Sequence, residues 1–341
     1  MIALGALPAN SESEFPSARV QVLAQEIFGV SGSAANAPHS QANPAGGAGI
    51  LLPRGSEALL PLVLDGLLAP DVRVAEAKSP LRVTHRRLDD REVYLVINDS
   101  AQPWSGAVEF AATGSGERWN PTTGQQEETL TTSGSKLSLA AYGAAVFRFT
   151  SALPPPRRKA TSGTLPHLSL RRLDNVTPTA PHGEFVRAEI LPDVAHSTNG
   201  AIAWQADAVL TKGKVDTHLF AQFRYPQPLD LSAADCLALE TWVPEGQSTP
   251  SQLLVILHEQ DGGDFIAETG RSLAAPGHEQ TFIPLGRFQL AGWSKDAAGV
   301  LDLRRVQDIR IGWGGYFGAE GEAVKFSVAW PQVGTVTRKV N

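Results

Sequence analysis

Aromatic side chains in the C-terminal half of the chain lie beside hydrogen-bonding groups. In its expected strand, Trp242 alternates with the apolar residues, so it lies on the other face of the strand, together with Glu240. Trp313, Tyr316 and Phe317 enclose two glycines, and glycines and aromatics in one loop are hard to bury together. Sugar recognition needs this combination, because a flat ring covers the C–H face of a pyranose while polar groups take its hydroxyls. We therefore predict all five as carbohydrate-binding residues, with core packing as the alternative for each aromatic.

Carboxylates and a histidine gather around one Gly-Gly string. The acidic residues are Glu259, Asp261, Asp264 and Glu268. A glycosidase needs two carboxyl groups, about 5 to 5.5 Å apart for retention or about 6.5 to 9.5 Å for inversion. Asp-Gly-Gly-Asp is also what a hairpin turn favours, so we expect a solvated turn, with calcium binding as a minor alternative, and predict no catalytic residue. His258, at a strand end, is expected at the surface and joins the predicted carbohydrate-binding residues.

Composition and spacing exclude several other kinds of site. Cys236 is the only cysteine, which excludes an intrachain disulfide and a CxxC pair and indicates a buried apolar residue. The eight histidines show no HExxH or HxH spacing, and the sequence contains no GxSxG elbow. A formal net charge of -6, without long runs of one sign, does not indicate binding to nucleic acid or to an anionic membrane. Neutral ligands such as sugars remain compatible.

The first 70 residues alternate between expected strands and helices. Residues 2–7 and 50–52 are short apolar runs typical of buried strands. Apolar residues at helical spacing between Pro16 and Gly29 predict one helix, and residues 57–68, followed by Pro70, predict a second. This β-α-β-α order is too short to complete a doubly wound sheet. We interpret residues 1–70 as the remnant of a larger, flavodoxin-like α/β domain.

The rest of the chain has the two-residue periodicity of strands. Alternating apolar residues and turn signals predict a small antiparallel β-sandwich over residues 71–150. Residues 151–166 combine a proline triplet with Ser and Gly, which is linker composition. Residues 167–341 contain about eight expected strands, which suits a jelly roll. The predicted fold class is therefore mostly β, with two β-sandwiches, the first fibronectin/Ig-like and the second a jelly roll, preceded by a partial α/β segment.

Two motifs in residues 85–143 resemble the small sandwich that follows the catalytic barrel in large bacterial glycoside hydrolases of α-L-rhamnosidase type. The first combines His85-Arg86 with the Tyr94-Leu-Val-Ile-Asn98 strand, and the second is the turn Trp119-Asn-Pro-Thr-Thr-Gly124. Proline and glycine fix that turn so that the tryptophan covers the end of the sandwich. In such enzymes a segment similar to Ile-Ala-Leu-Gly-Ala-Leu-Pro lies just upstream. The resemblance implies that the catalytic barrel of a parent enzyme is a partner of this chain.

A second resemblance covers about 110 residues of the C-terminal region. The strings Leu229-Asp-Leu-Ser232, Ile283-Pro-Leu-Gly-Arg-Phe288 and Leu301-Asp-Leu-Arg-Arg-Val306 are similar to those of galactose-binding-like sandwiches, especially carbohydrate-binding modules. It implies an oligo- or polysaccharide partner. Family members often hold a structural calcium through an early acidic residue, for which Asp174 is the match, and another in the last strand. Here residues 327–333 contain no aspartate, so only the first ligand position is matched.

Three hypotheses about function follow. In the first, the chain is the non-catalytic, carbohydrate-binding C-terminal part of a glycoside hydrolase acting on plant or microbial polysaccharide. In the second, it is a self-contained glycosidase using acidic residues of the jelly roll. In the third, it is a structural module that packs against the catalytic barrel and binds nothing. The N-terminus lacks the basic region of a signal peptide, and a secreted or periplasmic location is expected for the full-length parent.

Overall fold

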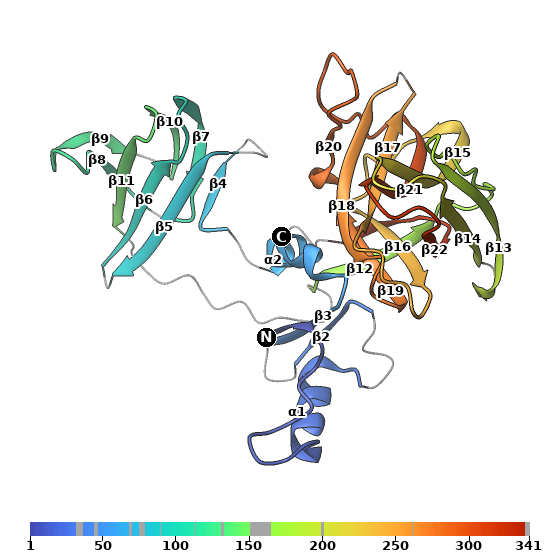
Figure 1. Cartoon of the computed structure of the whole chain (residues 1–341). Helices are drawn as coiled ribbons and strands as arrows, with labels where there is room; N and C mark the ends of the chain where they lie inside the picture. Colours follow the sequence, from blue (N-terminus) through green and yellow to red (C-terminus); the bar gives the residue numbers. More distant parts are fainter. Residues whose placement is uncertain are drawn as a thin grey trace. The chain divides into compact units, whose positions relative to one another are not determined.

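A computed structural model of the chain is mostly β, which confirms the predicted fold class. The structure describes residues 1–31, 37–43, 47–67, 70–74, 79–88, 90–112, 114–130, 133–150, 165–198, 201–260 and 262–337. Two compact units divide the chain (Figure 1): one joins Met1–Leu67 to Ala160–Asn341, and the other is Leu68–Lys159. Most of the predicted linker, residues 151–164, lies outside the described residues. Among the described residues, no helix is long and apolar enough to cross a membrane.

The smaller unit is an antiparallel sandwich of a three-stranded and a five-stranded sheet. The first sheet has the order β10-β7-β4 and the second β5-β6-β11-β8-β9. Phenylalanines and Tyr94 fill the space between them, with ring centroids of Tyr94 and Phe110 4.9 Å apart. The strands are β4 (Val72–Val74), β5 (Leu81–Leu88), β6 (Arg91–Asn98), β7 (Trp104–Phe110), β8 (Gly116–Trp119), β9 (Gln126–Leu130), β10 (Gly134–Leu139) and β11 (Ala144–Thr150).

The N-terminal segment of the larger unit has both predicted strands and both predicted helices, together with a strand, β2, that its sequence did not predict. Its elements are β1 (Ile2–Gly5), α1 (Ala18–Phe28), β2 (His39–Ala42), β3 (Ala48–Pro53), the 3-10 turn η2 (Glu57–Leu59) and α2 (Leu60–Leu67). Helix α1 ends at Gly29, whose φ of 72° is a left-handed conformation that glycine adopts readily. Strands β1 and β3 pair in parallel across this helix, and β2 adds to β3 in the antiparallel sense. A β-α-β unit is therefore present.

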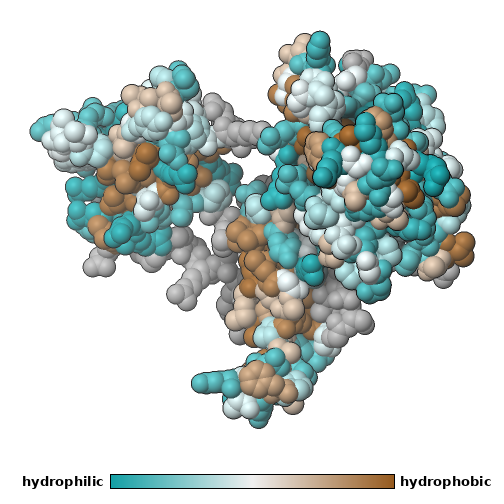
Figure 2. Space-filling model, viewed as in Figure 1, coloured by the Kyte–Doolittle hydropathy of each residue, from teal (hydrophilic) through white to brown (hydrophobic). Residues whose placement is uncertain are grey.

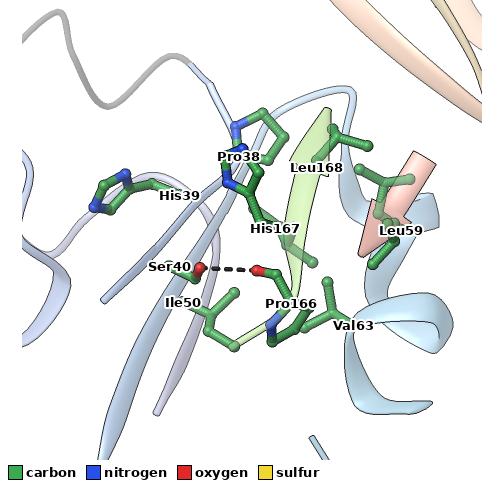
Figure 3. A pocket seen from close by; sticks show the side chains of 11 residues that line it. Pro38, His39, Ser40, Ile50, Leu59, Val63, Pro166, His167 and Leu168 are labelled. Atoms are coloured by element: carbon green, nitrogen blue, oxygen red, sulfur yellow. Dashed lines mark hydrogen bonds between the residues drawn. The ribbon is translucent and has the colours of Figure 1, made fainter. Parts of the chain in front are cut away.

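This segment packs onto the C-terminal sandwich instead of forming a unit of its own. Ile50, Leu52 and Leu59 share a buried cluster with Cys236 and Phe282 of the sandwich. The Ser40 hydroxyl donates a hydrogen bond of 2.9 Å to the carbonyl of Pro166, just before the first sandwich strand (Figure 3). Apolar side chains on a sheet this small find their burial against the neighbouring sheet. The predicted division at residue 70 thus separates sequence patterns, while the structure groups residues 1–67 with the sandwich.

Two antiparallel sheets form the C-terminal sandwich. The seven-stranded sheet has the order β12-β23-β16-β22-β14-β13, with β19 pairing the other edge of β16; the five-stranded sheet is β15-β21-β17-β18-β20 (Figure 1). The strands are β12 (His167–Arg172), β13 (Val186–Thr198), β14 (Ala201–Leu210), β15 (Thr217–Leu229), β16 (Cys236–Val243), β17 (Gln252–Glu259), β18 (Asp264–Ser272), β19 (Gly277–Pro284), β20 (Gln289–Leu290), β21 (Val306–Tyr316), β22 (Ala323–Ala329) and β23 (Gln332–Thr337), with the turn η3 (Leu285–Arg287) after β19.

The core of the sandwich lies between the two sheets, so each sheet also has an outer face turned away from the core. Strand alternation sends Phe223, Ile309, Leu257 and Phe265 inward, and their neighbours along the strands point outward. Much of the sandwich surface in Figure 2 is hydrophilic, whereas the N-terminal segment carries a broad hydrophobic area. Exposed side chains of that segment include Phe15 and Val22.

Candidate functional site

Four polar residues form a row across the outer face of the five-stranded sheet. Strand register places one residue from each of four neighbouring strands side by side: Arg224 on β15, Asp308 on β21, His258 on β17 and Asp264 on β18. A second row, one step along the strands, contains Gln222, Arg310, Ile256 and Ile266. Directly opposed side chains in a sheet are close enough to interact. The outer face therefore gathers charges that are far apart in the sequence.

Hydrogen bonds fix the two carboxylates of this face. Asp308 is fully buried and accepts bonds of 2.9 Å from Arg310 Nε and from Gln222 Nε2. Asp264 Oδ1 accepts from Arg310 Nη1 at 3.2 Å and lies 2.7 Å from His258 Nδ1. Arg310 thus bridges both carboxylates. Charge-assisted bonds of this kind hold side chains in defined positions before any ligand arrives.

Trp293 extends the face with an exposed ring that is also fixed in place. It is 62% exposed, and its indole N–H donates a 3.1 Å bond to Asp264 Oδ2. The backbone N–H of Asp264 in turn donates to the hydroxyl of Ser294, the next residue after Trp293. Because the indole N–H already holds the ring in place, stacking of a ligand on the exposed ring costs little further side-chain entropy. The loop that carries Trp293 is anchored to the row by both contacts.

The ionised form of Asp264 is favoured. Burial opposes ionisation, but the hydrogen bonds from His258 and Trp293 and the charge of Arg310 outweigh it and hold the pKa of the carboxyl below its usual value. Asp264 is therefore an acceptor across the physiological pH range. It has the properties of a fixed hydrogen-bonding group rather than those of a general acid.

A surface hollow of about 690 Å³ lies on the same face, and its lining reaches Gly292, the residue before Trp293. Its floor and wall come from strands β17 and β18, η3 and β20, and from the chain leading to Trp293. The lining residues include Leu254, Ile266, Glu268, Arg287, Gln289 and Gly292. Apolar side chains with a few polar groups at the margin are typical of ligand sites. The polar rows, Trp293 and this hollow together are called the outer-face site below.

Glu259 lies away from this face although it follows His258 directly. A Cβ at Gly263 would stand 3.0 Å from both Glu259 Oε2 and the ring of the core residue Phe265, which places the carboxyl on the core side. Burial raises the pKa of Glu259; the backbone N–H of Asp302 opposes the shift, and the charges of Asp296 and Asp302 add to it. Strands β17 and β18 form the expected hairpin, in which Glu259 is buried and Asp264 partly buried, whereas Glu268 is exposed.

The structure distributes the predicted carbohydrate-binding residues over several places. His258 belongs to the outer-face site. Trp242 and Glu240 lie on the outer face of the seven-stranded sheet, where Glu240 accepts a bond from Gln332. Tyr316 is half-buried, its hydroxyl bonded to Glu322 at 2.8 Å, whereas Phe317 beside it is 63% exposed.

The prediction for Trp313 is wrong. Strand β21 continues through the two glycines, so alternation points the Trp313 ring inward, where it is fully buried. It contacts Phe326 edge to face at 6.3 Å. Gly312 makes this possible, because a Cβ there would lie 1.9 Å from the carbonyl oxygen of Leu219 on the adjacent strand. Gly312 serves close strand packing, whereas Gly315, one of the two glycines after Trp313, has a positive φ of 69° within the strand.

The predicted calcium position has few ligands near it. Asp174 is exposed, and its Oδ1 accepts a 2.9 Å bond from the side chain of Asn175. Within the described ranges, no three Asp, Glu, His or Cys side chains cluster as metal ligands. Structural calcium therefore stays a prediction. Asp261, the remaining acid of the hairpin, lies outside the described residues.

Sequence reasoning missed Asp264, Asp308, Arg310 and Trp293 as members of a site. Asp308 and Arg310 alternate with the apolar residue Ile309, so they lie on the other face of the strand. The same alternation selected Trp242 and Glu240. That signal could have identified both. The bond between Arg310 and Asp264 joins residues 46 positions apart, and that between Trp293 and Asp264 joins residues 29 positions apart, so no local pattern predicts either.

No protein-family model matches this chain, and a search of curated proteins finds no match. Among solved structures, a family 11 carbohydrate-binding module of a cellulosomal cellulase of Clostridium thermocellum is similar at 14% identity, covering 50% of this chain and 95% of the module, with a TM-score of 0.38. A family 30 module of the same organism is 10% identical, with a TM-score of 0.32 over 49% of this chain and 94% of the module.

A rhamnosidase from Novosphingobium sp. PP1Y matches over nearly the whole chain. It is 13% identical over 96% of this chain, which spans 31% of the rhamnosidase, and the TM-score is 0.33. These identities and TM-scores are low, and the strand pairing of the chain itself defines its fold.

Proposed function

We propose that the outer-face site binds a neutral oligosaccharide or polysaccharide, and that the chain serves as the non-catalytic, carbohydrate-binding C-terminal part of a glycoside hydrolase. The observation that carries the proposal is the exposed Trp293 ring, fixed by its bond to Asp264 beside a row of pre-positioned polar groups. Stacking and fixed hydrogen bonds are the two requirements of sugar binding.

Charge balance favours a neutral sugar over an acidic one. Arg310 is already engaged by Asp264 and Asp308, and Arg224 stands 3.9 Å from Asp308. Each cation of the polar rows thus has a carboxylate partner. An anionic ligand would have to compete with those carboxylates, whereas hydroxyl groups can bond to the partly exposed Asp264 and Arg310 without displacing an ion pair.

The parent enzyme is proposed from the sequence motifs. The Trp119-Asn-Pro-Thr-Thr-Gly124 turn and the Leu-Asp-Leu strings resemble parts of large bacterial glycosidases. A catalytic barrel on the same polypeptide or in the same enzyme would be the partner of this chain, and plant or microbial polysaccharide its substrate. A secreted or periplasmic location fits such a substrate.

The alternative of a self-contained glycosidase gains little from this arrangement. Such an enzyme needs a general acid and a second carboxylate converging on one sugar. Glu259 has the raised pKa of an acid, and Asp264 the lowered pKa of a stable anion. However, Glu259 faces the core side beside Phe265 and Asp264 faces the outer side, so the two carboxyls do not converge.

Affinity electrophoresis of the whole chain in gels containing soluble glycans tests the proposal. The panel is mixed-linkage β-glucan, xyloglucan, galactomannan and arabinan. We expect retention by at least one polymer and a loss of affinity of about 30-fold in Trp293→Ala, as for a central stacking residue. Phe317→Ala is the matched control, because Phe317 is an equally exposed aromatic outside the rows.

Three outcomes would overturn the proposal. No retention by any polymer would refute carbohydrate binding. Loss in Phe317→Ala with full retention in Trp293→Ala would refute the outer-face site. Hydrolysis of aryl glycosides by the chain, abolished in Glu259→Gln, would replace the binding function with the enzymatic one.

A further inference from the structure

The outer face of the seven-stranded sheet is covered at one end and open at the other. Near Ala238 and Phe282 it is buried under the N-terminal segment, which reaches as far as the ion pair of Arg54 and Glu279, 3.5 Å apart. Beyond that point the register forms a row from four strands: Gln205 on β14, Ser327 on β22, Trp242 on β16 and His278 on β19. His278 is exposed, Gln205 and Trp242 are half-buried, and Ser327 is buried.

Three aromatic rings stand together on this open end. The ring centroid of Trp242 lies 5.0 Å from that of His196, with planes 25° apart, and 5.0 Å from that of His278, with planes 37° apart. Offset stacks at this distance are favourable and restrict ring motion. A single metal ion does not fit between the histidines, because the indole separates them.

A buried carboxylate fixes one end of the stack. Asp193 is 8% exposed and lies 2.6 Å from His196 Nδ1; it also accepts bonds from the hydroxyl of Ser327 and the backbone N–H groups of Ala195 and His196. These bonds outweigh burial and lower the pKa of Asp193. Because Nδ1 is engaged, the imidazole presents Nε2 on its other side. An orienting carboxylate of this kind sets which ring nitrogen meets a ligand.

Two of these rings, His196 and Trp242, line a hollow of about 290 Å³. Its other lining residues include Gln205, Glu245, Lys325 and Ser327. Lys325 is paired with Asp207, so the hollow carries no unbalanced cation from that residue. The volume is at the small end of ligand sites and suits one or two sugar rings. Aromatic wall, amide and hydroxyl are again the groups that a neutral sugar requires.

We infer that this hollow is a second carbohydrate site, on the face of the sandwich opposite to the outer-face site. The inference rests on the proposed function and extends it from one site to two. Because the two outer faces point away from each other, a short oligosaccharide fills only one site at a time. Each molecule therefore joins two separate glycan chains. Once one site is bound to an insoluble polysaccharide, the second site binds at a high effective concentration, which raises the overall affinity.

A capture assay with the whole chain separates one site from two. The protein is bound to an insoluble preparation of the glycan that retains it best in the four-polymer panel. A fluorescein-labelled soluble form of the same glycan is then added. We expect the wild type, shown to be monomeric by light scattering, to capture the labelled polymer. Trp242→Ala and Trp293→Ala should each still bind the solid but capture at least tenfold less.

The variants also report on folding and on the stack itself. Trp242→Phe keeps an aromatic wall and should recover most of the capture. Unchanged capture in Trp242→Ala would overturn the second site and leave the proposed function intact. Loss of all binding in Trp242→Ala would also overturn it, since an independent site leaves the other working. No binding by the wild type to any of the four polymers would overturn the proposed function, and the second site with it.

Discussion

The substitution Asp308→Ala tests the physical basis of the outer-face site. Asp308 is fully buried, and its oxygens accept bonds of 2.9 Å from Arg310 and Gln222. Both bonds end on a carboxylate, and a bond to a charged group contributes about 1.5 to 3 kcal/mol. Two such bonds give about 3 to 6 kcal/mol, which overlaps the ~3 to 5 kcal/mol lost when one partner of a buried pair is removed.

Urea unfolding followed by tryptophan fluorescence measures this loss, because five of the seven tryptophans belong to the C-terminal sandwich. Asp308→Asn keeps the size and one acceptor and should lose less stability than Asp308→Ala. Arg224→Ala is the control: its 3.9 Å contact is largely exposed and should change the unfolding free energy by less than about 1 kcal/mol. A loss below about 1 kcal/mol in Asp308→Ala would refute the reasoning that a buried, multiply bonded carboxylate organises this face.

Three further predictions follow from burial and from the shifted pKa values. Trp313→Ala should lower the unfolding free energy by about 3 to 5 kcal/mol, as expected for a fully buried tryptophan, while the folded protein keeps its glycan affinity; lost affinity at unchanged stability would contradict the core position. Because the pKa of Asp264 is lowered in the folded protein, its ionised form stabilises the fold at pH values above the unfolded-state pKa of about 3.9. This stabilisation is lost as the pH falls through the still lower folded-state pKa. The gap in urea midpoint between wild type and Asp264→Asn should therefore shrink between about pH 7 and pH 3, and a constant gap would count against the network. Burial raises the pKa of the Cys236 thiol to about 12, so Ellman's reagent at about pH 8 should modify it only after unfolding, and rapid labelling of the native chain would show that the N-terminal segment does not cover it.

Local sequence patterns determined most of the fold. Period-two alternation with turn residues predicted both sandwiches, because one face of each strand must be apolar to be buried. Gly29 marked the end of helix α1, where its positive φ completes the cap. The Gly-Gly string after Glu259 marked the β17–β18 hairpin. These features depend on a few neighbouring residues, which is why sequence alone reveals them.

Only the tertiary structure decided which side chains form sites. Trp313 and Trp293 have similar local settings beside glycine, yet the first is buried and the second exposed. Strand β21 passes so close to Leu219 that only glycine fits at position 312, and this extended path turns Trp313 inward. Asp264, Arg310 and Trp293 meet only because strands and loops distant in sequence lie side by side. The packing of the N-terminal segment likewise decides which half of the opposite sheet stays open. Hydrophobic periodicity reports the burial of each strand, but sites depend on register between strands, which long-range packing sets.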